Sequence, residues 1–336
     1  MAQLIQFRRG TAAAWTLANP VLASGEIGFE TDTNLYKIGN GTDDWSELYY
    51  GGLNPELGTI TFKAVSVEPS TPIAGSLRLY AKSIAGRLLP KILGPSGLDT
   101  PLQPSFFSNG IQFYMPGTST TPQAIGGPAL TAVGTVSHPN LASTNLRTQT
   151  SRFNLISAAT ANAAAEFRSA FLRIWRGDVA GLGGFFHRCR FSIVSTTANQ
   201  RSFFGFTTST SATLTTQEPR ALTNMFGVGN GLGETTLRMY QNDGSGNATE
   251  VNLGAEFPAN DPTAVYDLTL FAAANSDRIT WQITNLTTGA TATGEWLEAD
   301  LPTSTTFLCW HGYMNNGATA AAVNFDIMRV YTETDY

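Results

Sequence analysis

The 336-residue sequence predicts an all-β protein that ends in an antiparallel β-sandwich, either a jelly roll or a lectin-like sandwich. Short runs of alternating apolar and polar residues recur along the chain, and clusters of Gly, Asn, Asp, Ser and Thr separate them. Charged residues make up only 13% of the chain, roughly half the usual share, which suits surfaces that form hydrogen bonds with neighbours. We find no repeat of about 34 or 42 residues, so a solenoid and a propeller are excluded.

Residues 1–52 form the first predicted part, a module of very short strands with few apolar residues. Residues 25–30 alternate apolar and polar side chains, and residues 35–38 form another short run that a Gly-Asn-Gly turn ends. A unit of about fifty residues buries only a modest fraction of its surface. We therefore expect the core around Trp15 and Trp45 to be completed by further copies of the same chain.

The module contains an ordered pattern: R-R-G-T, W, N-P-x-L-x-x-G-E-I-G-x-E-x-D-T, K-I-G-x-G, W and L-x-Y. This pattern resembles the N-terminal module of bacteriophage tail-fibre and receptor-binding proteins, a family that includes the major tropism determinant. The resemblance implies a small β-prism packed about a threefold axis, and hence an elongated homotrimer attached to the virion. The residues expected to form trimer or attachment contacts are Arg8, Arg9, Trp15, Ile27, Phe29 and Trp45.

Residues 53–165 form the second predicted part, a β-rich collar and linker. Residues 75–82 alternate as a strand does, whereas the Pro- and Gly-rich run 94–104 predicts irregular structure. The pattern of residues 75–104 is similar to a connecting segment of phage and prophage tail proteins, which implies a spacer before a distal domain. The Ala-rich residues 158–167 predict a short helix or an extended entry to that domain.

Residues 166–336 form the third predicted part, the distal β-sandwich. The hairpin pattern of residues 278–296 resembles that of a lectin-type sandwich. Residues 227–233 carry four glycines at alternate positions and are expected to form a loop. The expected strands are 171–176, 185–194, 201–207, 237–241, 249–253, 264–272, 278–285, 290–296, 305–313 and 323–331.

The composition argues against several classes of partner. A net charge of −5 offers no basic surface for nucleic acid, and no run of about 18 apolar residues could insert into a membrane. The sequence begins without a signal-peptide pattern, and its two cysteines are too few for a disulfide scaffold. We therefore expect a protein that is made in the host cytoplasm and assembled into the virion.

Two short motifs place Cys and His at alternate strand positions, as a metal site could require. His187 and Cys189 would share one strand face, as would Cys309 and His311, and pairing of the two strands would close a Cys₂His₂ zinc site. The alternative is that all four are core side chains, because phenylalanines share these faces and Cys is among the most buried residue types. We expect core side chains here, and hence no metal and no other cofactor.

Recognition of a host glycan or protein is expected in loops and aromatic side chains of the distal sandwich. Sugar rings pack on aromatic faces while fixed polar groups bind their hydroxyls, and loops on a rigid scaffold often carry binding residues. The sequence contains no carboxylate pair with a glycosidase motif and no nucleophile elbow, so we expect no enzymatic activity. The expected binding residues are Tyr240, Asn242, Asp243, Trp296, Asn315 and Asn316.

Together these features predict a phage virion fibre that adsorbs to the host surface through its C-terminal sandwich. The expected partners are sister chains in the trimer, other virion proteins at the N-terminus, and a host surface glycan or protein. Three weak distal sites on one fibre would gain affinity through their high effective concentration. Two alternatives stay open: a structural or decorating fibre of the capsid or baseplate without a receptor of its own, and a polysaccharide depolymerase.

Overall fold

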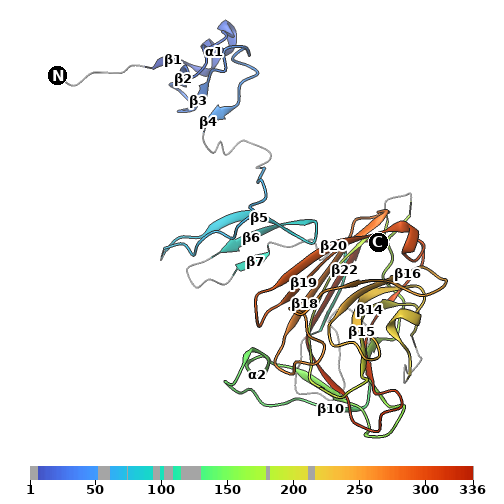
Figure 1. Ribbon diagram of the computed structural model, residues 1–336. Coiled ribbons are helices and arrows are strands. Elements are labelled where there is room, and N and C mark those ends of the chain that lie inside the picture. Colours follow the sequence, from blue (N-terminus) through green and yellow to red (C-terminus); the bar gives the residue numbers. More distant parts are fainter. Residues whose placement is uncertain are drawn as a thin grey trace. The chain divides into compact units, whose positions relative to one another are not determined.

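The computed structural model describes residues 7–51, 61–73, 75–93, 99–101, 109–114, 130–178, 182–210 and 216–335. The chain divides into two compact units, Met1–Lys63 and Ala64–Tyr336, and Figure 1 labels many of their strands. Strands are the main regular elements of both units, so the predicted all-β class is confirmed. Within the described ranges, no helix is both long enough and apolar enough to cross a membrane.

The first unit contains a four-stranded sheet and one short helix. Its elements are β1 (Arg8–Gly10), α1 (Ala12–Ala18), β2 (Ile27–Glu30), β3 (Tyr36–Ile38) and β4 (Tyr50–Gly51), with the strands in the order β1-β2-β3-β4. Only strands are expected here from the sequence. The helix forms because alanines follow Thr11, whose hydroxyl accepts a hydrogen bond from the Ala14 amide at 3.2 Å. It ends at Asn19, which has a positive φ of 37°.

The interior of this unit is built around two tryptophans. Trp15 and Trp45 stack with their ring centroids 4.2 Å apart, and they are only 4% and 2% exposed. Gly28 makes room for them, since a Cβ at that position would lie 2.5 Å from the Trp45 ring. Leu22 and Leu48 complete the cluster. The prediction that these tryptophans need sister chains to shield them is therefore wrong: the stacked indoles and the missing Gly28 side chain let one chain cover both.

The two faces of β2 are the reverse of the expected alternation. Gly28 and Glu30 are buried, whereas Ile27 and Phe29 are only partly buried. Glu30 is 1% exposed and accepts a hydrogen bond from the Tyr50 hydroxyl at 2.6 Å. The hydrogen-bonded Glu30 carboxylate thus takes the buried position where an apolar side chain is expected, and Ile27 and Phe29 stay partly exposed.

The second unit contains two large antiparallel sheets. The eight-stranded sheet has the order β10-β11-β22-β13-β18-β19-β20, and β8 also pairs with β22. Its strands are β8 (Asn109–Tyr114), β10 (Thr135–Ser137), β11 (Phe153–Ile156), β13 (Phe185–Ile193), β18 (Tyr266–Ala272), β19 (Arg278–Asn285), β20 (Thr291–Leu297) and β22 (Asn324–Asp335).

The seven-stranded sheet has the order β17-β16-β15-β14-β21-β12-β9. Its strands are β9 (Leu130–Val133), β12 (Ala164–Ser169), β14 (Arg201–Thr207), β15 (Met225–Asn230), β16 (Arg238–Asn242), β17 (Thr249–Asn252) and β21 (Cys309–Asn315). A separate three-stranded sheet consists of β5 (Arg78–Ile84), β6 (Arg87–Leu93) and β7 (Asp99–Pro101). Short helical turns are α2 (Leu146–Gln149), η1 (Pro219–Ala221) and η2 (Glu298–Asp300).

The two large sheets pack face to face over an aromatic core. Phe191 of β13 stacks on Phe204 of β14 with ring centroids 4.1 Å apart, and Phe185 stacks on Phe226 of β15 at 5.6 Å. All four side chains belong to one large buried apolar cluster that includes residues of both sheets. The predicted antiparallel β-sandwich is therefore confirmed.

Several strands differ from those expected. The sequence predicts a loop at residues 227–233, yet Gly227 and Gly229 lie in β15, where the Phe203 ring crosses Gly227 so closely that a Cβ would meet it at 2.9 Å. Residues 171–176 form no strand, and Ile174 makes only an isolated bridge. In the irregular run 94–104, residues 99–101 form β7 and the others lie outside the described residues.

The Ala-rich residues 158–167 form no helix, and their last part begins strand β12. Strands β8 to β12 all join the two large sheets although they start before residue 166. Strand pairing thus begins earlier than the predicted domain boundary, because the short alternating runs find partners at the far C-terminal end of the chain, in β21 and β22.

Candidate functional site

The outer face of the eight-stranded sheet carries the candidate site. Along β13, Phe185, His187 and Cys189 point into the core, so Phe186, Arg188 and Arg190 point to the opposite face. β22 pairs with β13 and presents Glu333, Tyr331 and Arg329 opposite Phe186, Arg188 and Arg190. Charged and aromatic side chains therefore meet on one surface.

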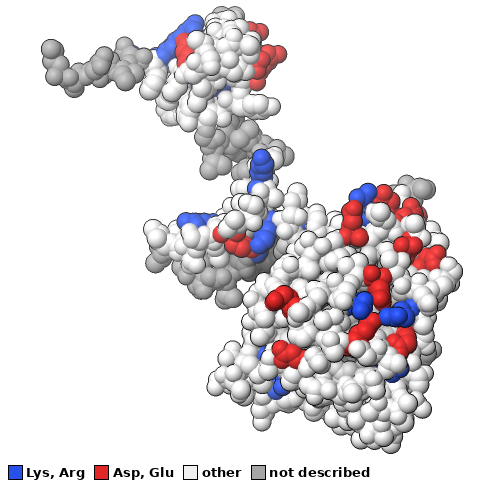
Figure 2. All heavy atoms as spheres, in the orientation of Figure 1, with Lys and Arg blue, Asp and Glu red and all other residues white. Residues whose placement is uncertain are grey.

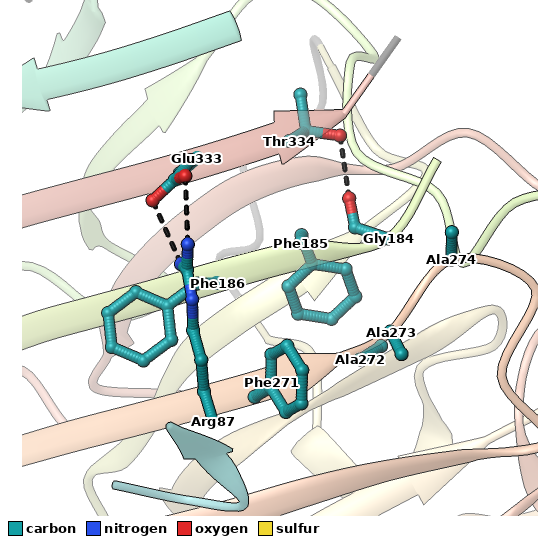
Figure 3. Close-up of a pocket in the computed structure, with 10 residues that line it drawn as sticks. All are labelled: Arg87, Gly184, Phe185, Phe186, Phe271, Ala272, Ala273, Ala274, Glu333 and Thr334. Carbon is teal, nitrogen blue, oxygen red and sulfur yellow. Dashed lines mark hydrogen bonds and ion pairs between the residues drawn. The ribbon is translucent and has the colours of Figure 1, made fainter. Parts of the chain in front are cut away.

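A pocket of about 240 Å³ lies at one end of this face (Figure 3). The Arg87 guanidinium donates two hydrogen bonds to the Glu333 carboxylate, at 2.8 and 2.9 Å, and lies 4.9 Å from the centroid of the Phe186 ring. The Tyr331 hydroxyl donates to the same carboxylate at 2.9 Å. The residues that line the pocket are Arg87, Gly184, Phe185, Phe186, Phe271, Ala272, Ala273, Ala274, Glu333 and Thr334.

Two turns hold these side chains in place. The β5–β6 turn places Ala85 and Gly86 at positive φ, 48° and 81°, so that β6 starts with Arg87 above the sheet. The Thr280 hydroxyl of β19 donates to the Ala85 carbonyl and ties this turn to the sandwich. On the other side, the Thr334 hydroxyl donates to the Gly184 carbonyl at 2.7 Å.

The chemistry of this pocket suits binding. Burial and the neighbouring Glu333 raise the pKa of Tyr331, so its hydroxyl stays a hydrogen-bond donor at neutral pH. Phe271, which is partly exposed, offers an aromatic face beside a charged pair, as sugar-binding sites often do. Among the described residues that line the pocket, Glu333 is the one carboxylate, whereas glycoside hydrolysis uses two.

A second hollow, of about 400 Å³, is lined by the same turn and by β19 and β20. Its lining is mostly polar or small. The residues concerned are Ser83, Ala85, Gly86, Thr280, Trp281, Gln282, Thr293, Gly294 and Glu295. Together the two hollows give this face of the sandwich room for a ligand larger than one small group.

The residues predicted to bind a ligand do not form one surface. Asn242, Asn315 and Asn316 are at most 3% exposed, and each donates its amide to a backbone carbonyl of its own chain. Tyr240 is fully buried and Trp296 is 2% exposed in the core. These five side chains therefore serve the fold, because the loops and strands next to them need hydrogen-bond partners and apolar filling.

Asp243 alone of the six predicted binding residues is only partly buried, and it lies just after β16. Its carboxylate accepts hydrogen bonds from the Gly244 and Ser245 amides at 2.6 and 2.8 Å. These bonds and that from the Ser245 hydroxyl lower the pKa of Asp243. The residue therefore closes a polar turn.

The four Cys and His side chains of the metal hypothesis are not brought together. His187 and Cys189 lie on β13 and face the core, where the His187 ring contacts Phe206 at 4.7 Å. Cys309 and His311 lie on β21, and Trp310 between them points into the core, so they face the outer side of the other sheet. The proposed tetrahedron cannot close, because the two motifs belong to different sheets and opposite faces.

The pocket residues Arg87, Phe186 and Glu333 were missed by sequence reasoning. Arg87 and Glu333 are 246 residues apart in the sequence, and only the fold brings Arg87 to the last strand. One usable signal was present: the outward face of the long strand 185–194 carries Arg188 and Arg190. Charged residues on one face of a strand with an apolar opposite face mark a solvent surface.

In the first unit, the predicted attachment residues fall into two groups. Trp15 and Trp45 are buried as described above, whereas Arg8 and Arg9 are exposed. The Arg8 guanidinium lies 5.4 Å from the Trp15 ring centroid, so it covers the buried pair.

The fold defines a protein with a small mixed module followed by an antiparallel β-sandwich. Residues 5–43 match the family described as the major tropism determinant N-terminal domain. Two hyaluronoglucosaminidases of Streptococcus pyogenes phages are 46% and 44% identical to the chain over 46 residues, which is 14% of its length. The aligned part is 12% and 14% of the length of these two relatives. The resemblance of the N-terminal module to phage proteins is thus confirmed.

Solved structures with a similar arrangement of strands include two plant lectins. Peanut lectin matches 67% of this chain and 97% of its own, with 14% sequence identity and a TM-score of 0.45. Winged bean acidic lectin, solved with methyl-α-D-galactose, matches 68% of this chain and 98% of its own, with 11% identity and a TM-score of 0.44.

Proposed function

We propose that this protein is a phage virion fibre, such as a tail fibre, that adsorbs to the host cell surface through its β-sandwich. The observation that carries the proposal is the match of residues 5–43 to the major tropism determinant N-terminal domain. The module would bind other virion proteins, and the sandwich would bind a glycan or protein of the host surface. The aromatic and charged pocket on the outer face of the eight-stranded sheet supports the second assignment.

We propose the same surface as the receptor site, with Phe271 and the ion pair of Arg87 and Glu333 at its centre. An aromatic ring beside fixed donors and acceptors can hold a sugar by its apolar face and its hydroxyls at once. The volume of about 240 Å³ lies below the usual range of pockets for drug-sized ligands, so it suits one sugar unit of a longer chain.

Trimerisation belongs to the same proposal. The first unit exposes large apolar side chains although its own core is complete: Leu17 and Tyr49 are each 90% exposed, and Ile38 is 50% exposed. Apolar surface of this kind is typical of contacts with other chains. Light scattering of the full chain is expected to give about 108 kDa, three times the 35.9 kDa of one chain. A mass of one chain at micromolar concentration would contradict the trimer.

The receptor assignment is tested by adsorption of the full chain to a panel of bacterial cells and to an array of bacterial glycans. We expect Phe271→Ala to lower binding at least tenfold, because it removes the aromatic face of the pocket. Val251→Ala removes an exposed apolar side chain from β17 of the other sheet and serves as the control. Equal binding by both variants would show that the pocket is not the receptor site.

The alternatives give different results in the same assay. A structural or decorating fibre would bind no cell and no glycan in any form. A polysaccharide depolymerase would shorten the polymer during incubation, and that loss of length would depend on carboxylate side chains.

A further inference from the structure

The hollow of about 400 Å³ lies over the outer face of β19 and β20. Trp281 of β19 belongs to the core cluster, so Thr280 and Gln282 on either side of it point outward. On β20, Thr293 stands directly opposite Gln282, and Glu295 stands opposite Thr280. Four polar side chains therefore form the floor of the hollow.

Two of these four side chains have unused hydrogen-bonding groups. The Thr280 hydroxyl donates to a carbonyl of the β5–β6 turn, and the Glu295 carboxylate accepts a hydrogen bond from Arg278 at 3.0 Å. Among the residues that the structure describes, the Gln282 amide and the Thr293 hydroxyl have no partner. An amide supplies two N–H donors and an acceptor oxygen, and a hydroxyl both donates and accepts. The floor of the hollow can therefore bind a ligand that carries several hydroxyl groups.

The hollow carries little charge. Glu295 is the one charged side chain among the described residues that line it, and Arg278 pairs with it. Most of the visible surface of the sandwich is likewise uncharged in Figure 2, and over β14 to β16 positive and negative side chains lie next to one another. There Arg220 pairs with Glu234 at 2.7 Å. An anionic ligand in the hollow would meet a carboxylate, whereas the hydroxyls of an uncharged ligand would meet hydrogen-bonding partners.

The hollow and the pocket of Figure 3 adjoin one another at the β5–β6 turn. Phe271 of the pocket stands directly opposite Thr280 of the hollow. A Cβ at Gly86 of the turn would lie 3.0 Å from the Thr280 hydroxyl and 3.7 Å from the Phe271 ring, so the turn rests on both residues. Gln282 is the diagonal neighbour of Phe271, at about 7–8 Å. An aromatic face and a set of hydrogen-bonding groups thus lie within reach of one chain of sugars.

We propose that this hollow is a second sugar subsite, which binds an uncharged unit of the host glycan through Gln282 and Thr293. One sugar unit packs on Phe271 in the pocket, and the hydroxyls of another bond to the amide and the hydroxyl in the hollow. The class of ligand is therefore a neutral glycan of at least two units. The inference rests on the proposed receptor role of this face.

The test measures binding of the full chain to three neutral polymers, dextran, mannan and galactan, and to carboxymethylated forms of the same three. We expect binding to at least one neutral polymer, and binding at least tenfold weaker to its carboxymethylated form. Thr293→Val and Gln282→Met each remove hydrogen-bonding groups at similar size and are expected to lower binding about two- to tenfold. Thr291→Val is the matched control, because Thr291 is an exposed threonine of the same strand outside the lining of the hollow.

Stability separates a ligand site from a structural role. Gln282 and Thr293 have no partner among the described residues, so both variants are expected to keep the native midpoint of thermal unfolding. Lower midpoints in both would assign a structural role to these side chains and would overturn the subsite. Native binding by both variants would overturn it as well, as would a native chain that binds none of the neutral polymers or prefers the carboxymethylated forms.

Cell adsorption distinguishes failure of the subsite from failure of the proposed function. If the native chain and both variants adsorb equally to host cells, the subsite is excluded and the fibre proposal stands. If the native chain binds a neutral polymer through Gln282 and Thr293 but adsorbs to no cell, the subsite stands and the receptor role fails.

Discussion

The two units of this protein reach a buried core by opposite means. The first unit has a cluster of four apolar side chains, Trp15, Leu22, Trp45 and Leu48, and it buries Lys37 beside them. The sandwich has a continuous apolar cluster with members in both large sheets. In the small unit each of these side chains makes its own specific contact, while in the sandwich many apolar side chains fill one shared core.

This difference explains why the small unit restricts its residue types more strongly than the sandwich does. Gly28 cannot be replaced without meeting Trp45, and Lys37 donates to the Trp45 carbonyl at 2.7 Å with its ammonium 4.4 Å from the Tyr50 ring centroid. Such constraints fix residue types, and residues 5–43 match a family model. A large core tolerates exchange of apolar residues of similar volume, so similar folds share few identities.

Trp45→Ala tests the comparison with the largest expected effect. Loss of a buried tryptophan costs about 3–5 kcal/mol, which is about all that the core of a unit this small supplies. We expect the first unit to unfold while the sandwich stays folded. Calorimetry should show loss of one transition.

Labelling of the two cysteines measures unfolding of the sandwich independently of the first unit. Burial raises the pKa of Cys309 to about 12 and raises that of Cys189 well above its usual value, so neither thiol reacts until the sandwich unfolds. Trp45→Ala should leave thiol labelling slow. Phe191→Ala, a similar loss in the other core, should accelerate labelling and leave the first unit intact. Fast labelling of Trp45→Ala would show that the two units are not independent.

The sequence predicts the sandwich better than it predicts the site. Alternation of apolar and polar residues along residues 185–194 gave the correct strand and the correct inward face, because one period governs nine residues. In contrast, Asn242, Asn315 and Asn316 look like exposed loop residues but bond to backbone carbonyls of distant segments. Whether a polar side chain faces solvent depends on which distant segment of the chain packs over it. The local sequence does not encode that packing.

The small unit shows the same limit in another form. In strand β2, Gly28 and Glu30 face inward. The two indole rings leave no room for a side chain at position 28, and the Glu30 carboxylate accepts a hydrogen bond from the Tyr50 hydroxyl. The alternation of apolar residues predicts the opposite face. Where a few large rings fill the core, a glycine can be the most buried position of a strand.

Arg87→Ala has the next largest expected effect and concerns the sandwich. It leaves the buried Glu333 carboxylate without its cation, at a cost of about 1–3 kcal/mol. The double variant Arg87→Ala with Glu333→Gln should recover most of that loss. The measurement is the free energy of unfolding of the sandwich by chemical denaturation, and the transition of the sandwich is the one that coincides with thiol labelling. A double variant as unstable as the sum of the single ones would show that the pair has no coupling.

Lys37→Met has the smallest expected effect and concerns the pH dependence of the first unit. Burial lowers the pKa of Lys37 from its usual 10.5, an effect that the charge of Glu30 partly opposes. Between the lowered pKa and 10.5, the unfolded chain binds more protons than the folded one, so stability must rise with pH in that window. The slope is at most about 1.4 kcal/mol per pH unit.

The slope can be isolated by denaturing the first unit at several pH values below 10.5. Lys37→Met should abolish the rise, and it should also lower stability at neutral pH, because the Trp45 carbonyl loses its donor. Lys63→Met changes an exposed lysine of the same unit and should keep the native slope. Parallel curves for the native chain and Lys37→Met would mean that the ammonium reaches water.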